Sequence, residues 1–212
     1  MSPFPTEMTD RWENRPDPRP DIGAVYWHML VGGNSTVAAT AIAAQRLLAG
    51  FPELHMTPQR WLHVTVLCAG TTNEIGRESM YAMLKQARES VLHIPPAQVE
   101  IGRIIYHPEA IMLAVTPRRV LQPVLEAVQT ATRTVTGTEG FVNGGTTMGW
   151  TPHITVCYST ARQPAEPVIT ALGKSIGTRD IIVDTFSLVV QWGSERLWDW
   201  ELVGTISLME KD

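Results

Sequence analysis

The chain has 212 residues, of which 44% are hydrophobic and 18% are charged, and its formal net charge is −4. This composition is typical of a soluble globular protein with its own core, and it argues against a long binding surface for duplex nucleic acid, which requires a dense basic face. No apolar run reaches the roughly 20 residues of a membrane span, and the N-terminus lacks the apolar segment of a signal peptide, so we expect a cytoplasmic protein that does not bind membranes.

The N-terminal part predicts an arm followed by a strand and a helix. Residues 1–22 hold five prolines among polar residues, so we expect an extended arm or a disordered tail. Residues 23–32 are rich in Val, Tyr and Trp and predict a strand. His28 lies in this strand, where a single histidine is more often packed than catalytic. Ser35 is the expected cap of a helix over residues 35–48.

The middle of the chain alternates strands and helices. Residues 60–69 predict a strand, and residues 73–92 predict a helix with one apolar stripe. Two further strands are expected over residues 99–106 and 110–116, separated by a tight turn. Pro117 then opens a helix that runs to about residue 135.

The stretch of residues 137–149 is the most loop-like part of the interior and contains five glycines. Glycines allow close approach of the backbone to a ligand, or simply a long connection. The stretch lacks the lysine of a nucleotide-binding P-loop, so it is weak evidence for a nucleotide site. It leads directly into the strand that begins at Pro152.

The C-terminal part predicts a short helix over residues 164–176 and two strands, over residues 181–192 and 197–208. A hairpin turn at residues 193–195 joins these two strands. Three tryptophans flank the turn, and we expect most of them to be packing anchors, with one or two able to stack on a nucleobase: Trp192, Trp198 and Trp200.

Two strands share one pattern: His63-Val64-Thr65-Val66 and His153-Ile154-Thr155-Val156. Successive side chains of a strand point to opposite faces, so the His and the Thr of each copy share one face. The apolar residues then point into a core. Ordinary buried strands with Thr chosen for its β-propensity would explain each copy, but not the duplication.

The duplication predicts the architecture. His63 and His153 are 153 − 63 = 90 residues apart, and around each the order is strand, helix, His-x-Thr strand, helix, strand. We therefore expect an α+β fold in which residues 23–212 form one domain of two lobes. Each lobe would be an antiparallel sheet flanked by helices, and a pseudo-twofold axis would bring the two motif strands together across a cleft.

Two imidazoles and two hydroxyls suit phosphodiester chemistry. One His can accept a proton from the attacking oxygen while the other protonates the leaving oxygen, because imidazole titrates near neutral pH. The hydroxyls of Thr65 and Thr155 can donate to the phosphoryl oxygens. In-line attack requires the two histidines on opposite sides of the phosphorus, which two facing strands would provide.

Other chemistries fit the sequence less well. A metal site would need further ligands, and neither motif strand contains Asp or Glu. Cys157 falls on the predicted face of His153 and Thr155, but no orienting partner for a thiol nucleophile is evident, so we expect it to line the cleft floor. Cys68 and Cys157 have neither metal-ligand nor redox spacing, and both are expected to be reduced. A serine-hydrolase G-x-S-x-G motif is missing.

Over about residues 23–208 the chain resembles the two-histidine phosphoesterases, and most closely their 2′-5′ RNA ligase-like and cyclic phosphodiesterase branch. The resemblance rests on the paired motifs and on the order of the elements around them. It implies hydrolysis of a 2′,3′-cyclic phosphate or a 2′-5′ phosphodiester bond, without metal or cofactor. It also implies that His63 and His153 are catalytic, that Thr65 and Thr155 bind the substrate phosphate, and that a monomer acts on a nucleotide or a short RNA end.

The chain departs from this family after each motif. Many relatives carry an Arg or Lys there, whereas this chain has Cys68-Ala69-Gly70 and Tyr158-Ser159-Thr160. Three arginines are candidates to supply the missing charge: Arg60, Arg103 and Arg162. Two alternatives stay open, namely a module that binds nucleotides or RNA ends without turnover, and a phosphoesterase acting on a non-nucleotide cyclic phosphate.

Overall fold

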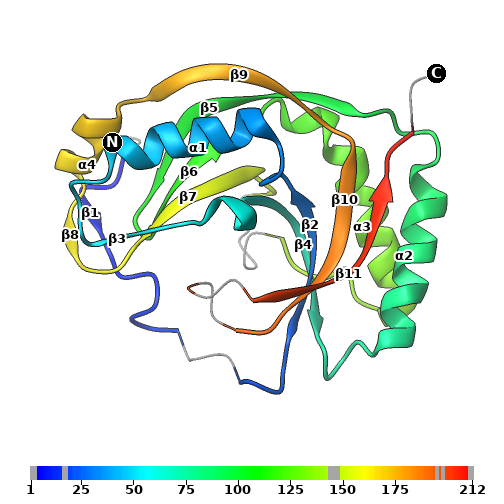
Figure 1. Cartoon of the computed structure of the whole chain (residues 1–212). Coiled ribbons are helices and arrows are strands. Elements are labelled where there is room, and N and C mark those ends of the chain that lie inside the picture. The colour runs from blue at the N-terminus through cyan, green and yellow to red at the C-terminus, as the bar shows by residue number, and fades with distance from the viewer. Residues whose placement is uncertain (1–3, 16–18, 143–148, 194–195, 197–198, 210–212) are drawn as a thin grey trace.

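The computed structural model describes residues 4–15, 19–142, 149–193, 196 and 199–209. Within these residues the chain forms an α+β fold, as predicted (Figure 1). Its α-helices are α1 (Ser35–Leu47), α2 (Arg77–Val91), α3 (Gln122–Thr136) and α4 (Glu166–Leu172). Its strands are β1 (Glu7–Met8), β2 (Ala24–Leu30), β3 (Leu54–Met56), β4 (His63–Thr71), β5 (Ala97–His107), β6 (Ala110–Ala114), β7 (His153–Ser159), β8 (Gln163–Pro164), β9 (Ser175–Val183), β10 (Thr185–Gln191) and β11 (Trp200–Ser207). None of the helices in this part of the chain is long and apolar enough to cross a membrane.

Antiparallel pairing joins the main strands in the order β11-β10-β2-β4-β7-β6-β5-β9, with β3 added to β7. The two motif strands β4 and β7 lie at the centre of this order. They pair at one position, Val64 opposite Ile154. Apart from β3, the sheet therefore has two four-stranded parts that meet at the motif strands, and we call them the β4 half and the β7 half.

Each half combines strands from distant parts of the chain. The C-terminal strands β10 and β11 complete the β4 half, while β5, β6 and β9 complete the β7 half. Helices α2 and α3 pack together on the β4 half, and α1 packs against β7 and β9 (Figure 1). This arrangement is consistent with the predicted two lobes, but the halves do not correspond to the N- and C-terminal halves of the chain.

The predicted helix over residues 35–48 corresponds to α1, but its cap is Asn34 and not Ser35. The Asn34 side-chain oxygen accepts hydrogen bonds from the backbone N–H groups of Thr36 and Val37, at 3.0 and 3.1 Å. Asn is at least as good a cap as Ser, and it lies one residue earlier, where the backbone is still extended. Ser35 is already the first helical residue.

The prediction of one strand over residues 181–192 is wrong, because this stretch contributes to two strands in different halves. Strand β9 pairs with β5, and β10, which begins at Thr185, pairs with β2. Figure 1 shows β9 running along the outer edge before the chain turns into β10. Only Asp184 separates the two strands in the sequence, so hydrophobicity alone could not reveal the change of partner. Helix α4 is shorter than predicted and ends before Gly173.

Two further boundaries differ from the sequence-based prediction. The first motif strand begins at His63, because Gln59–Trp61 form a 3₁₀ turn. Helix α3 begins at Gln122, because another 3₁₀ turn, Arg118–Val120, follows Pro117. Part of the predicted hairpin turn, and Trp198, lie outside the described residues.

The N-terminal residues 4–15 pack on the end of the β7 half. Strand β1 pairs with β8, and the Met8 side chain is 1% exposed. The backbone N–H of Thr9 donates to the Pro108 carbonyl at 2.8 Å, and that of Arg11 donates to the Ser159 carbonyl at 2.9 Å. This segment therefore lies next to the carboxyl end of the second motif strand.

Candidate active site

The pairing of Val64 with Ile154 brings the two motifs together. Both side chains are buried in the main core. Directly opposed residues of an antiparallel pair share a face, so the residues on either side of these two point to the other face. That face therefore carries all four predicted site residues: His63, Thr65, His153 and Thr155. We call it the site face.

Each motif strand contains a β-bulge immediately after its Thr. On β4, Thr65 pairs with His28 and Leu67 with Trp27, which leaves Val66 as the extra residue. On β7, Thr155 pairs with Met112 and Cys157 with Ile111, which leaves Val156 as the extra residue. A bulge shifts the alternation of side chains by one residue. The repeated position of the bulge extends the similarity of the two motifs beyond their sequence.

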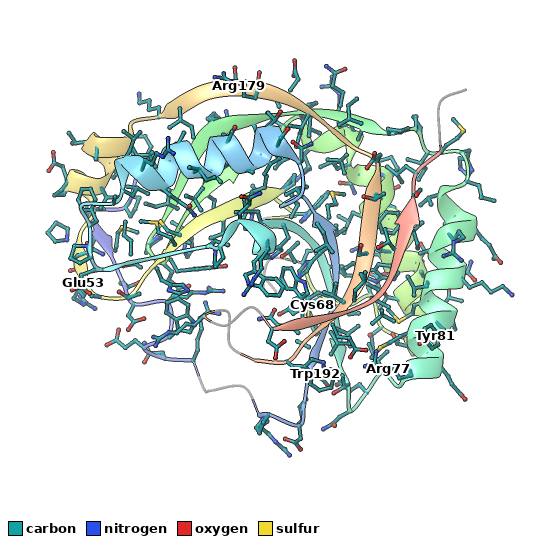
Figure 2. The ribbon with its side chains drawn as sticks, viewed as in Figure 1. Glu53, Cys68, Arg77, Tyr81, Arg179 and Trp192 are labelled. Atoms are coloured by element: carbon teal, nitrogen blue, oxygen red, sulfur yellow. The ribbon has the colours of Figure 1, made fainter. Side chains whose placement is uncertain are left out.

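The second bulge overturns the predicted position of Cys157. Its side chain is 0% exposed and belongs to the main core, while Tyr158 takes the place on the site face. Burial raises the pKa of the Cys157 thiol to about 12, so the thiol is protonated at neutral pH. Cys157 therefore neither lines the cleft floor nor supplies a nucleophile. On β4, Leu67 corresponds to Cys157, and Cys68, near the middle of the molecule in Figure 2, corresponds to Tyr158.

The two motif histidines are oriented by the same hydrogen bond. Nδ1 of His63 lies 2.7 Å from the carbonyl oxygen of Trp61, and Nδ1 of His153 lies 2.7 Å from that of Thr151. A carbonyl oxygen can only accept, so each Nδ1 carries the hydrogen. In the neutral ring Nε2 is then the basic nitrogen, and in the charged ring Nε2 carries the transferable proton. Both histidines are thus held in the tautomer that suits proton transfer at Nε2.

The surroundings of His153 favour its neutral form. Burial lowers the pKa of His153, and the positive charges of His107 and Arg11 lower it further, against the opposing effect of the Thr151 carbonyl. A general base must be neutral before it accepts a proton. At neutral pH His153 is therefore in the form that a base requires.

A third histidine, His28, lies against His63. Its ring centroid is 4.3 Å from that of His63, and the ring also stacks on Tyr26 at 5.0 Å between centroids. The side chain is 1% exposed, and neither ring nitrogen has a hydrogen-bond partner within the described residues. Burial and then the charge of His63 lower the pKa of His28 well below its ordinary value, so the ring is neutral. Sequence reasoning placed His28 on a strand, but only the pairing of β2 with β4 brings it to the site.

Tryptophans surround the first motif on the site face. The Trp200 ring meets His63 edge-on at 5.1 Å between centroids, and Trp61 at 4.7 Å. Trp61, Trp200, Trp12 and Met112 pack with Ala110 and Tyr158 in a cluster separate from the main core. Trp200 is thus the flanking tryptophan that reaches the motif, whereas Trp192 packs against the main core.

Of the three arginines predicted to supply positive charge, Arg60 lies beside a motif. Its guanidinium carbon is 5.0 Å from the centroid of the Trp61 ring. Arg162 forms an ion pair with Glu7 at 2.8 Å, and Arg103 lies opposite Ser175 where β5 pairs with β9. Sequence reasoning missed Arg11, whose charge reaches His153 from the N-terminal arm.

The glycine-rich stretch and Trp150, which follows it directly, both contact the first motif strand. The indole Nε1 of Trp150 donates to the Thr65 carbonyl oxygen at 2.9 Å. Phe141 and Cys68 exchange backbone hydrogen bonds of 2.8 and 2.7 Å. Gly140 lies so close to the Cys68 carbonyl that a Cβ atom there would be 2.5 Å from its oxygen. In this part of the stretch the glycine allows close approach to another backbone segment, while residues 143–148 lie outside the described part.

The site face thus presents two imidazole Nε2 atoms and two hydroxyls from a pair of similarly built strands. No group of three or more His, Cys, Asp or Glu side chains arranged to hold a metal ion occurs within the residues the structure describes. Arg60, and Arg11 through its charge, supply positive potential near the motifs. Such a set can bind a phosphoryl group and move protons on two sides of it.

The fold is similar to solved structures of two bacterial proteins. TT0787 of Thermus thermophilus has a TM-score of 0.66 and 16% sequence identity, over 89% of this chain and 100% of that protein. E. coli LigT in its apo form has a TM-score of 0.63 and 13% identity, over 89% of this chain and 99% of LigT. LigT complexed with 3′-AMP has a TM-score of 0.61 and 14% identity over the same shares.

The sequence itself matches one family along most of its length. No curated protein sequence matches the chain. The family described as the 2′-5′ RNA ligase superfamily matches residues 35–195, which include both motifs, their bulges and three of the seven tryptophans. The chain therefore belongs to the 2′-5′ RNA ligase superfamily, a superfamily of two-histidine phosphoesterases.

Proposed function

We propose that the protein hydrolyses a 2′,3′-cyclic phosphate or a 2′-5′ phosphodiester bond of a nucleotide or RNA end, without a metal. His63 and His153 would be the acid and base, and Thr65 and Thr155 would hold the phosphoryl oxygens. The single observation that carries this proposal is the matched 2.7 Å hydrogen bond of each Nδ1 to a carbonyl two residues earlier. A merely structural histidine has no need of the same tautomer at both motifs.

The proton transfers follow from this arrangement. Nε2 of the neutral histidine takes a proton from water, and the water oxygen forms a bond to phosphorus. The bond from phosphorus to one ribose oxygen breaks, and the other histidine gives its Nε2 proton to that oxygen. One histidine begins neutral and the other charged, so the second turnover requires a proton exchange with solvent. The lowered pKa of His153 supports its assignment as the base in this direction.

The threonines support the proposal by their position. The register at Val64 and Ile154 sets Thr155 beside His63 and Thr65 beside His153. Each hydroxyl can therefore donate to a non-bridging oxygen of a phosphoryl group held between the two rings. Such donors stabilise the charge that builds on these oxygens in the transition state.

Three observations support a nucleotide as the substrate. Trp200 and Trp61 offer aromatic faces beside His63, and Arg60 stacks on Trp61. Base stacking on aromatic rings contributes about 1–3 kcal/mol per base. LigT, which is similar in fold, has been solved with 3′-AMP and with ATP. We also propose that residues 23–212 form one catalytic domain and that the protein acts as a monomer.

Phosphorus NMR tests this proposal directly. The protein would be given 2′,3′-cyclic nucleotides and 2′-5′ dinucleotides in excess EDTA, with His153→Ala as the paired variant. We expect a phosphomonoester to form with the wild type and not with the variant. Turnover that EDTA abolishes, or that His153→Ala retains, would contradict the proposed chemistry.

A further inference from the structure

The N-terminal arm lies outside the family match, which begins at residue 35, and yet it reaches the site face. We propose that Arg11 in this arm binds a second phosphate of the substrate, beyond the one that reacts. The substrate would then be a nucleotide end that carries a further phosphate, such as a 5′-phosphorylated cyclic nucleotide or the next linkage of an RNA chain. This inference rests on the proposed function and specifies its substrate.

The backbone fixes the position of Arg11. Strand β1 pairs with β8, Met8 is buried, and the Thr9 and Arg11 N–H groups donate to Pro108 and Ser159. Ser159 ends the second motif strand. Main-chain hydrogen bonds at Thr9 and at Arg11 itself therefore anchor the arm, in addition to its side-chain contacts.

The Arg11 side chain extends over the site face. Its guanidinium carbon is 5.3 Å from the centroid of the Tyr158 ring, and the bulge in β7 turns this ring toward the same face as His153 and Thr155. Tyr158 packs in one cluster with Met112, which lies directly opposite Thr155. Arg11 thus contacts a ring in the same side-chain cluster as Met112, the residue opposite the proposed phosphate-binding Thr155.

Trp12 carries the arm across to the other half of the sheet. Its ring is 5.6 Å from that of Tyr158 in the β7 half. The Arg196 guanidinium also lies 4.3 Å from the indole centroid, and Arg196 belongs to the connection between β10 and β11 in the β4 half. The arm therefore contacts both halves of the sheet beside the site face. A segment in this position can contribute side chains to a substrate bound on that face.

The charges around Arg11 suit a phosphate. Glu109 Oε2 accepts hydrogen bonds from Arg11 Nη1 at 2.6 Å and from Arg15 Nη2 at 2.7 Å, so two guanidinium groups converge on one carboxylate. The charge of Arg11 also lowers the pKa of His153. A planar guanidinium matches the oxygen geometry of a phosphate. The arm thus supplies the cation that the residues following each motif lack.

Two pairs of ligands that differ by one phosphate test the inference. The substrates are adenosine 2′,3′-cyclic phosphate with and without a 5′-phosphate, compared by kcat/KM. The product analogues are adenosine 3′,5′-bisphosphate and adenosine 3′-phosphate, compared by titration calorimetry. For the wild type we expect the extra phosphate to raise kcat/KM or affinity about 10- to 100-fold, the usual size of a charge-assisted hydrogen bond. Arg11→Ala should lose this preference, and Arg11→Lys should keep part of it.

The controls separate phosphate binding from arm docking and from general charge. Arg19→Ala removes an exposed arginine that pairs with Asp21 in the same arm, and the preference should persist. Glu109→Gln removes the shared carboxylate, and the preference should increase. Equal response to both ligands of each pair in the wild type, or a preference that survives Arg11→Ala, would overturn the inference.

The calorimetric comparison keeps this test independent of turnover. If the wild type discriminates between the bisphosphate and the monophosphate but hydrolyses neither cyclic substrate, the second-phosphate site stands and the proposed function fails. If both cyclic substrates are hydrolysed equally and His153→Ala is inactive, the proposed function stands and the arm inference fails.

Discussion

The indole Nε1 of Trp150 donates a 2.9 Å hydrogen bond to the backbone carbonyl of Thr65, 85 residues earlier in the chain. Trp150 precedes the second motif by three residues, and Thr65 belongs to the first. The Trp150 side chain is 3% exposed, so this bond is shielded from water. The bond fixes the chain segment that leads into His153 relative to the strand that carries His63.

Trp150→Phe should therefore reduce both stability and turnover. The loss of one buried hydrogen bond is expected to lower the free energy of unfolding by about 1 kcal/mol, measured by urea denaturation. Because the bond joins the two motifs, kcat should also fall. Trp27→Phe is the matched control, since its indole donates to Thr132 in the core at 3.1 Å. It should reduce stability similarly and leave kcat unchanged, and a fall in kcat for both variants would argue against a specific role for Trp150.

The pH dependence of kcat/KM should report the lowered pKa of His153. A base loses activity as the pH falls through its pKa, so the acid limb should lie below the ordinary histidine value of about 6.5. Arg11→Gln removes one of the charges that lower the pKa, and the acid limb should move to higher pH. Arg19→Gln should leave the limb in place. An acid limb that is unchanged in Arg11→Gln would contradict the electrostatic link between the arm and His153.

His28→Met should stabilise the protein. Both ring nitrogens of His28 are buried without hydrogen-bond partners within the described residues, which costs about 1–3 kcal/mol. Met is the residue at the corresponding place in the other half, since Met112 faces Thr155 as His28 faces Thr65. We expect the free energy of unfolding to rise by about 1 kcal/mol in chemical denaturation, and Met112→His to lower it. A loss of stability in His28→Met would show that His28 has stabilising contacts of its own.

Asn34→Ala should reduce stability by about 1 kcal/mol, the usual cost of removing a helix N-cap. Ser35→Ala is the control, because Ser35 is exposed and lies inside the helix. It should change the midpoint of thermal unfolding little. Equal losses for the two variants would mean that Ser35 shares the capping role.

Much of the site could be predicted because strand periodicity is local. Alternation alone placed His63 with Thr65, and His153 with Thr155, on one face, and the duplication suggested that the two strands meet. The Val64–Ile154 pair brings these four residues together. The fold class followed from the order of strands and helices along the chain.

The errors concern features that depend on strand pairing. Cys157 was assigned to the site face because an uninterrupted strand alternates strictly, whereas the bulge at Val156 exists only in relation to Met112 and Ile111 on β6. The change of partner between β9 and β10 is invisible for the same reason, since only Asp184 separates the two strands in the sequence. His28 reaches His63 through pairing across two strands, and single-sequence patterns do not contain that information.

The arm illustrates a different limit. Its prolines predict a segment with little regular structure, but they say nothing about where it docks. Arg11 and Trp12 reach the site face through hydrogen bonds to Pro108 and Ser159 and through the Tyr158 ring. These partners are far away in the sequence, so the position of the arm could emerge only from the three-dimensional structure.

The central claim is that His63 and His153 act as one acid–base unit. The most direct test measures kcat for His63→Ala, His153→Ala and the double variant on the best substrate found by phosphorus NMR, with folding checked by circular dichroism. Each single substitution should reduce kcat about 10²- to 10⁴-fold, and the double variant should be hardly worse, because residues that act as a unit are not additive. Near-wild-type turnover in either folded single variant, or losses that multiply in the double variant, would contradict the account.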